Sequence, residues 1–304
     1  MAGELETGIL KAVSRSFYLS LKLLPAPMRR GASIGYLLAR ASDTIADSST
    51  ESPGRCMILL DEFSAQIQGS IEPAPWPDDL ISGLEDEGEA ELLRQHVDLM
   101  KALVSLDPAE AELVREVLAV IIGGQKLDLE RFGEASAAKV VALSDAAALE
   151  DYTWRVAGCV GVFWTKLGYL TMGEGFSRSP QDELLAHAVD YGKGLQLVNI
   201  LRDLPKDLRA GRCSLPVADP RDIPLLMGEF EKRREEAMAK VEHGFRYSEK
   251  LRGKRLRLSS RLPAMIAKET LEGMKGISFG KLEEGYKVSR KRVYLMILGG
   301  FLSV

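Results

Sequence analysis

Cysteine and histidine are scarce in this chain of 304 residues, which contains only three of each. Cys56, Cys159 and Cys213 lie far apart and form no C-x-x-C motif, so neither a zinc site nor a disulfide framework is predicted. The first residues are acidic and contain no apolar run, which argues against a secretory signal. We therefore expect a protein of the reducing cytoplasm.

An excess of positive charge and long apolar runs are also lacking. The formal net charge is −4, which excludes a global basic field and with it a nucleic-acid partner. The apolar stretch 293–304 is interrupted by glycines and is too short to cross a bilayer. We interpret it as a last core helix or a frayed tail. A peripheral contact with the inner face of the membrane is the alternative, there or through the basic segment 250–257.

Patterns that alternate apolar and polar residues, as strands require, are hard to find. Apolar residues instead recur every three or four positions almost throughout, for example at Leu5, Ile9 and Val13. This periodicity predicts an all-α protein. The proline-containing loops 73–79 and 173–180 are short, and apolar periodicity resumes on either side, so we expect a single domain over residues 1–304.

Two pairs of aspartates stand out, Asp43 with Asp47 and Asp203 with Asp207. The four-residue spacing places both members of a pair on one helix face, about one turn apart. The residues that lead into each pair are apolar, and buried carboxylates are costly unless a cation binds them. Two such faces turned toward each other would suit Mg²⁺ and a substrate diphosphate. For one pair alone, a solvated helix face is the simpler interpretation.

Four motifs follow one another along residues 14–290. They are Arg15-Ser16-Phe17, Tyr36-x3-Arg40-x2-Asp43-x3-Asp47, Asp151-Tyr152-x3-Val156-Ala157-Gly158-x2-Gly161 and Gln196-x2-Asn199-x2-Arg202-Asp203-x3-Asp207-x4-Arg212. With these motifs in this order, the chain resembles the squalene/phytoene synthase family, the head-to-head prenyltransferases.

The resemblance implies an all-α isoprenoid-synthase fold, with helices around a central cavity that has an acidic mouth and an apolar depth. It also implies a role for each motif residue. Mg²⁺ would be held by Asp43, Asp47, Asn199, Asp203 and Asp207. The substrate diphosphates would be bound by Ser16, Phe17, Arg40, Gln196, Arg202 and Arg212. The catalytic set would be Tyr36 and Tyr152, which face the reacting carbons, with Asp43 and Asp203.

The expected reaction joins two farnesyl diphosphates through presqualene diphosphate, ending in squalene, dehydrosqualene or hydroxysqualene. Squalene would need hydride from NADPH, which the family binds without a Rossmann fingerprint. One alternative is phytoene synthesis from two geranylgeranyl diphosphates, which differs mainly in tunnel depth. Another is a non-catalytic helical scaffold that retains the fold. The oligomeric state is left open.

Some residues outside this set also carry expectations. The small residues from Val156 to Gly161 would line a prenyl tunnel or allow close helix packing, and Pro205 would distort the turn that carries Asp207. Asp128 lies where relatives often show Gly-Met-x-x-Asp-Leu; here the segment is Gly124-Gln125-Lys126-Leu127-Asp128-Leu129. The charged run 231–236 and the three histidines are expected on solvated helix faces.

Overall fold

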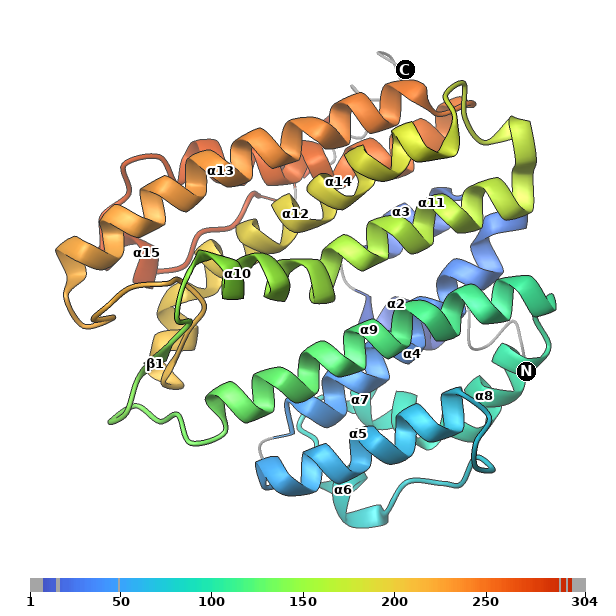
Figure 1. Cartoon of the computed structure of the whole chain (residues 1–304), viewed down its shortest axis with the longest axis horizontal. Coiled ribbons are helices and arrows are strands. Elements are labelled where there is room, and N and C mark those ends of the chain that lie inside the picture. The colour runs from blue at the N-terminus through green and yellow to red at the C-terminus, as the bar shows by residue number, and fades with distance from the viewer. Residues whose placement is uncertain (1–7, 15–16, 49, 290, 294, 297–304) are drawn as a thin grey trace. The chain divides into compact units, whose positions relative to one another are not determined.

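The computed structural model describes residues 8–14, 17–48, 50–289, 291–293 and 295–296. Helices dominate this part of the chain, which confirms the predicted all-α class (Figure 1). The α-helices are α2 (Leu10–Val13), α3 (Phe17–Leu23), α4 (Ala26–Ala46), α5 (Pro53–Ile67), α6 (Asp78–Ser82), α7 (Glu87–Arg94), α8 (His96–Val104), α9 (Pro108–Phe132), α10 (Ala146–Thr153), α11 (Cys159–Met172), α12 (Gln181–Arg209), α13 (Ile223–Lys250), α14 (Lys254–Gly273) and α15 (Phe279–Glu283).

Other regular structure is short. A π-helical turn, η2 (Trp154–Gly158), joins α10 to α11, and a 3₁₀ turn, η3 (Gly173–Gly175), follows α11. The strands β1 (Val141–Ala142) and β2 (Arg212–Cys213) pair in parallel, with Val141 opposite Arg212. Strands of two residues do not alter the fold class.

Contacts divide the chain into two compact units. Unit 1 comprises residues 1–130 and 166–173, and unit 2 comprises residues 131–165 and 174–304. The single domain over residues 1–304 stays a prediction.

Unit 1 is built around α4, which packs on α5, α7 and α8. The helix starts after Pro25 and has Pro27 in its first turn, where a missing N–H costs no hydrogen bond. Its buried face includes Leu37, Leu38 and Ile45. This face orients α4 through the hydrophobic effect and so determines which of its residues remain accessible.

His96 belongs to the core of unit 1. Only 1% of the residue is exposed, and its ring packs 4.9 Å from Trp76 and 5.4 Å from Phe63 between ring centroids. Its Nε2 is hydrogen-bonded to Gln66. The expected surface position was wrong because the chain turns at Gln95 between α7 and α8, so local periodicity does not place His96. Burial lowers the pKa of His96 to about 4.

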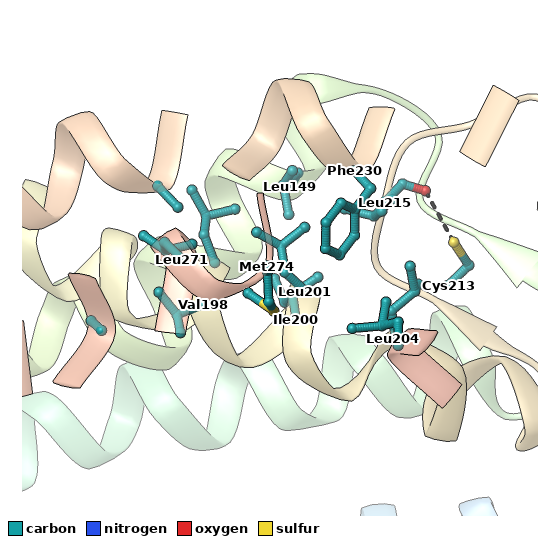
Figure 2. Packing of buried hydrophobic residues seen from close by; sticks show 14 of the residues in the cluster. Leu149, Val198, Ile200, Leu201, Leu204, Cys213, Leu215, Phe230, Leu271 and Met274 are labelled. Carbon is teal, nitrogen blue, oxygen red and sulfur yellow. Dashed lines mark hydrogen bonds between the residues drawn. The ribbon is translucent and has the colours of Figure 1, made fainter. Parts of the chain in front are cut away.

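In unit 2, α12 packs on α13 and α13 packs on α14 (Figure 1). Figure 2 shows the apolar core of this unit, where Leu201 and Leu204 from α12 lie near Phe230 from α13 and Met274 at the end of α14. Cys213 of β2 also belongs to this core, and its Sγ contacts the carbonyl oxygen of Leu215 at 3.4 Å. The strand pair therefore closes one edge of the cluster.

The small residues of η2 and α11 support close packing against α12. A Cβ on Gly161 would lie 2.2 Å from the carbonyl oxygen of Ala188, and one on Gly192 would lie 2.3 Å from that of Ala157. Separations below 3 Å leave no room for a side chain at either glycine. The packing interpretation of this motif is supported, and its tunnel-lining role stays a prediction.

Two other local expectations are corrected. α12 runs unbroken from Gln181 to Arg209 with the buried Pro205 inside it, so Asp207 lies on a regular helix. In the charged run, Arg233 and Arg234 are 7% and 5% exposed and pair with glutamates three or four residues away. The expected ion pairs form, but these two arginines line the packed side of α13 rather than solvent.

Candidate active site

The acidic face of α4 carries Tyr36, Arg40, Asp43 and Asp47. Their spacings of four, three and four residues place them along one side of the helix. α4 ends at Ala46, and Asp47 is its C-cap, so both carboxylates lie where the backbone carbonyls of the last turn point outward. The helix dipole disfavours anions at this end, which adds to the need for a cation.

Arg40 is held between two carboxylates. It forms an ion pair with Glu89 of α7, and its Nη1 lies 3.9 Å from Asp43 Oδ2. Burial by itself would lower the pKa of Arg40, but Glu89 and Asp43 raise it. Its Nε is buried and has no hydrogen-bond acceptor in the part of the chain that the structure describes. A guanidinium whose Nε–H is not used by the protein can donate a hydrogen bond to an anionic ligand such as a diphosphate.

Asp43 lies in an environment that opposes its ionisation. Burial and the neighbouring Asp47 raise the pKa of Asp43 to about 6, although Arg40 and a hydrogen bond from Gln125 act in the other direction. Gln125 Nε2 lies 2.7 Å from Asp43 Oδ1. Sequence reasoning missed both Gln125 and Glu89 as site residues, because they come from other helices.

Two aromatic residues meet at the start of this face. The rings of Phe17 and Tyr36 are stacked, with centroids 5.4 Å apart and planes at 28°. The Tyr36 hydroxyl donates to the carbonyl oxygen of Val13 at 3.3 Å. Ser16 lies outside the described residues, so its predicted diphosphate contact stays a prediction.

The acidic face of α12 carries Gln196, Asn199, Asp203 and Asp207, spaced by three, four and four residues. It too lies near a helix C-terminus, since α12 ends at Arg209. Asn199 Nδ2 donates to Gln196 Oε1 at 3.3 Å, and Gln196 Nε2 donates to the Tyr152 hydroxyl at 3.5 Å. These bonds connect Tyr152 of α10 to the α12 acidic face.

Arg202 forms a bidentate ion pair with the carboxylate of Asp203. Its Nε and Nη2 donate to the two carboxylate oxygens at 2.8 and 2.6 Å. These bonds raise the pKa of Arg202, against the effect of burial. Arg212 lies on β2 and is exposed, and its predicted contact with the substrate diphosphate stays a prediction.

The donor sets fit magnesium, which typically takes one or two carboxylates and fills its other positions with water and substrate phosphate. Each acidic face offers two carboxylates one turn apart. Within the described ranges there is no cluster of three or more histidine, cysteine, aspartate or glutamate side chains suited to a metal. The aspartate pair of α4 belongs to unit 1 and that of α12 to unit 2. That the two pairs lie at one cavity stays a prediction.

No helix in the described part of the chain is both long and apolar enough to span a membrane.

Comparison with known proteins places these features in a family. The family model for squalene/phytoene synthase matches residues 10–293. The chain is 28% identical to a presqualene diphosphate synthase of Zymomonas mobilis, over 69% of this chain and 59% of that protein. It is 26% identical to a 15-cis-phytoene synthase of Synechocystis, over 68% of this chain and 53% of that protein. It therefore spans little more than half the length of these curated relatives.

The fold is shared as well. A solved complex of TcSQS with the ligand BPH1237 superposes with a TM-score of 0.79, covering 99% of this chain and 86% of that one at 22% identity. The predicted family is confirmed: the chain belongs to the squalene/phytoene synthase family of prenyltransferases, whose members condense prenyl groups head to head.

Proposed function

We propose that this protein condenses two molecules of farnesyl diphosphate to presqualene diphosphate in a magnesium-dependent reaction. One observation supports the proposal above the others. On each of two helices a pair of aspartates lies near the C-terminus beside an arginine, Arg40 on α4 and Arg202 on α12. Acids at this end of a helix are unfavourable without a cation, and arginines beside them suit a diphosphate. The similarity to a presqualene diphosphate synthase supports the same product.

The reaction begins with ionisation. The C–O bond of one substrate breaks, its electron pair leaves with diphosphate, and the allylic cation forms a bond with the double bond of the second substrate. Loss of a proton closes a cyclopropane, so two substrates yield presqualene diphosphate, diphosphate and one proton. Bound Mg²⁺ would neutralise the charge that develops on the leaving group.

Each residue of the site has a part in this proposal. Asp43 and Asp47 on α4, with Asp203 and Asp207 on α12, would hold the metal together with Asn199. Arg40 and Arg202 would exchange their present carboxylate partners for diphosphate oxygens, and Ser16, Phe17, Gln196 and Arg212 would complete that binding. Tyr36 and Tyr152 would face the reacting carbons, where an aromatic ring can stabilise a cation.

Product analysis tests the proposal. The purified protein is incubated with farnesyl or geranylgeranyl diphosphate and Mg²⁺, with and without NADPH, and the products are identified by mass spectrometry. We expect presqualene diphosphate and inorganic diphosphate from farnesyl diphosphate. Squalene formed only with NADPH would add the reductive step. If no diphosphate is released from either substrate, the enzymatic proposal fails and the scaffold alternative gains support.

Phytoene synthesis is the second candidate, because the chain is 26% identical to a 15-cis-phytoene synthase. Both reactions need the same metal-binding and diphosphate-binding groups, so they differ in the length of prenyl chain that is accommodated. Phytoene formed from geranylgeranyl diphosphate, with no product from the shorter substrate, would replace the first candidate with this one.

A peripheral contact with anionic lipid is a further part of the proposal. Residues 176–178 pair with residues 250–252, since the Arg178 N–H donates to the Lys250 carbonyl and the Arg252 N–H to that of Phe176. This pairing brings Arg178 next to the basic turn between α13 and α14, where Arg252, Lys254 and Arg255 are exposed. Flotation with phosphatidylglycerol vesicles should recover the protein at low salt. Equal recovery with phosphatidylcholine would contradict an electrostatic contact.

A further inference from the structure

The side chain of Gln125, on α9, connects that helix to the acidic face of α4. Its Nε2 lies 2.7 Å from Asp43 Oδ1 and 2.9 Å from Ser42 Oγ. The assignment of nitrogen to this position follows from chemistry. Ser42 Oγ already donates to the carbonyl oxygen of Ala39, and a carboxylate only accepts, so both neighbours require a donor.

The other atom of the same amide is unsatisfied. Gln125 Oε1 is buried and has no hydrogen-bond donor within the described residues. A buried carbonyl oxygen without a donor is unfavourable, so such an atom calls for a partner that arrives from outside. The adjacent acidic face is the place where the proposed function requires a hydrated cation.

Asp43 is held on both sides. Gln125 contacts Oδ1, whereas the guanidinium of Arg40 lies 3.9 Å from Oδ2. Arg40 is the residue proposed to turn toward the substrate diphosphate, and it would then no longer hold Asp43. Gln125 is uncharged and comes from a different helix, so its hydrogen bond can persist through substrate binding.

We propose that Gln125 is a positioning residue for the cation that the α4 acidic face binds. Its amide N–H group fixes the Asp43 carboxylate, and its carbonyl oxygen would accept a hydrogen bond from water that accompanies the bound cation. The inference rests on the proposed function in requiring Mg²⁺ at this face. Groups that orient metal ligands from outside the coordination shell commonly contribute 10–100-fold, roughly, to metal affinity.

Gln125→Met tests this role. Methionine has a similar volume but neither donates nor accepts hydrogen bonds like an amide. The first measurement needs no prenyl substrate: the unfolding midpoint is followed while Mg²⁺ is titrated in the presence of inorganic diphosphate. We expect the half-saturating Mg²⁺ concentration to rise by about tenfold in the variant. In turnover assays the same shift should appear, with kcat at saturating Mg²⁺ kept to within about threefold.

Gln66→Met is the matched control. Gln66 is a buried glutamine of the same unit, and its amide contacts Glu62 and His96 rather than an aspartate of the acidic face. This variant is expected to lower the unfolding midpoint without changing the Mg²⁺ requirement. A merely structural role for Gln125 would give the same result, so the two variants separate positioning from packing.

The outcomes distinguish this inference from the proposed function. If Gln125→Met keeps the wild-type Mg²⁺ requirement, the inference about Gln125 is overturned and the function stands. If the wild-type protein shows the Mg²⁺-dependent stabilisation and the variant shows the shift, but no prenyl diphosphate is consumed, the inference stands and the function fails. Absence of any Mg²⁺ effect on the wild-type protein overturns the inference.

Discussion

At the scale of single residues, two of the three arginines expected to bind diphosphate, Arg40 and Arg202, are already paired with carboxylates. Arg40 pairs with Glu89 and lies near Asp43, while Arg202 forms a bidentate ion pair with Asp203. Substrate and metal would have to replace these contacts together, since a diphosphate that takes the arginine leaves the aspartate to a cation. Before substrate arrives, the present ion pairs reduce the electrostatic repulsion between the carboxylates of each acidic face.

Asp43→Asn removes a proposed metal ligand, and yet it should stabilise the metal-free protein at neutral pH. The folded-state pKa of Asp43 is raised to about 6, above its ordinary value of 3.8. Folding therefore favours the protonated carboxyl, and stability falls as pH rises from about 4 through 6. The neutral asparagine avoids this loss, so its advantage should appear above pH 6 and vanish near pH 4.

Circular dichroism melts with EDTA at pH 4 and pH 7.5 test this prediction. We expect a gain of about 1–3 °C at pH 7.5, modest because 46% of the Asp43 side chain is exposed and solvent weakens the effect. Glu72→Gln, which removes an exposed carboxylate of unit 1, is the control and should show no such pH dependence. A lower midpoint for Asp43→Asn at pH 7.5 would contradict the electrostatic explanation.

At the scale of helices, close backbone contacts hold α12 in place. Gly192 approaches the carbonyl oxygen of Ala157 in η2, and Gly161 of α11 approaches that of Ala188 in α12. The π-helical turn lies between Tyr152 and these glycines, and such turns are frequent at functional sites. Packing here therefore determines where α10 presents Tyr152 to the α12 acidic face.

Gly192→Ala should destabilise the protein by about 1–3 kcal/mol, because its new methyl group would meet backbone atoms that cannot move independently. Chemical denaturation followed by circular dichroism measures the loss. Gly228→Ala is the matched control in the same unit, since Gly228 lies within α13 and, among the described residues, no atom beyond its own stretch of that helix comes within 4 Å of its Cβ position. We expect the control to be neutral or stabilising by up to about 1 kcal/mol. Equal effects of both substitutions would argue against tight packing at Gly192.

At the scale of the whole molecule, the proposed chemistry requires the acidic faces of α4 and α12 to act as one site. The two faces belong to separate compact units, so the contacts within either unit do not establish a shared site. Residues that act as a unit give strongly non-additive losses when they are substituted together. Kinetics can therefore test the requirement directly.

Asp43→Asn and Asp203→Asn should each lower kcat for the first ionisation by at least about 100-fold. The double variant should be no more than about tenfold slower than the worse single variant, because either substitution already disables the shared site. Release of inorganic diphosphate from farnesyl diphosphate is the measurement, and unchanged helical circular dichroism is the control. Losses that multiply in the double variant would show that the two faces act independently.

Much of this protein was predictable from local pattern alone. The periodicity of three and four residues determined the all-α class, and the spacing of the aspartates determined that Asp203 and Asp207 share a helix face. Both inferences depend on neighbours within a few residues, which helix geometry relates directly. The expected distortion at Pro205 was wrong because the packing of α12 in its core outweighs a local preference.

Tertiary structure alone decided which distant groups contact the acidic residues. Gln125 reaches Asp43 from 82 residues away, Glu89 reaches Arg40 from 49, and His96 meets Gln66 from 30. No period in the sequence encodes such pairs, because they depend on the direction in which each helix enters the core. The sequence by itself thus determined the fold class and the members of each acidic face. Packing between helices decided which hydrogen bonds and ion pairs those residues form, and how their pKa values are shifted.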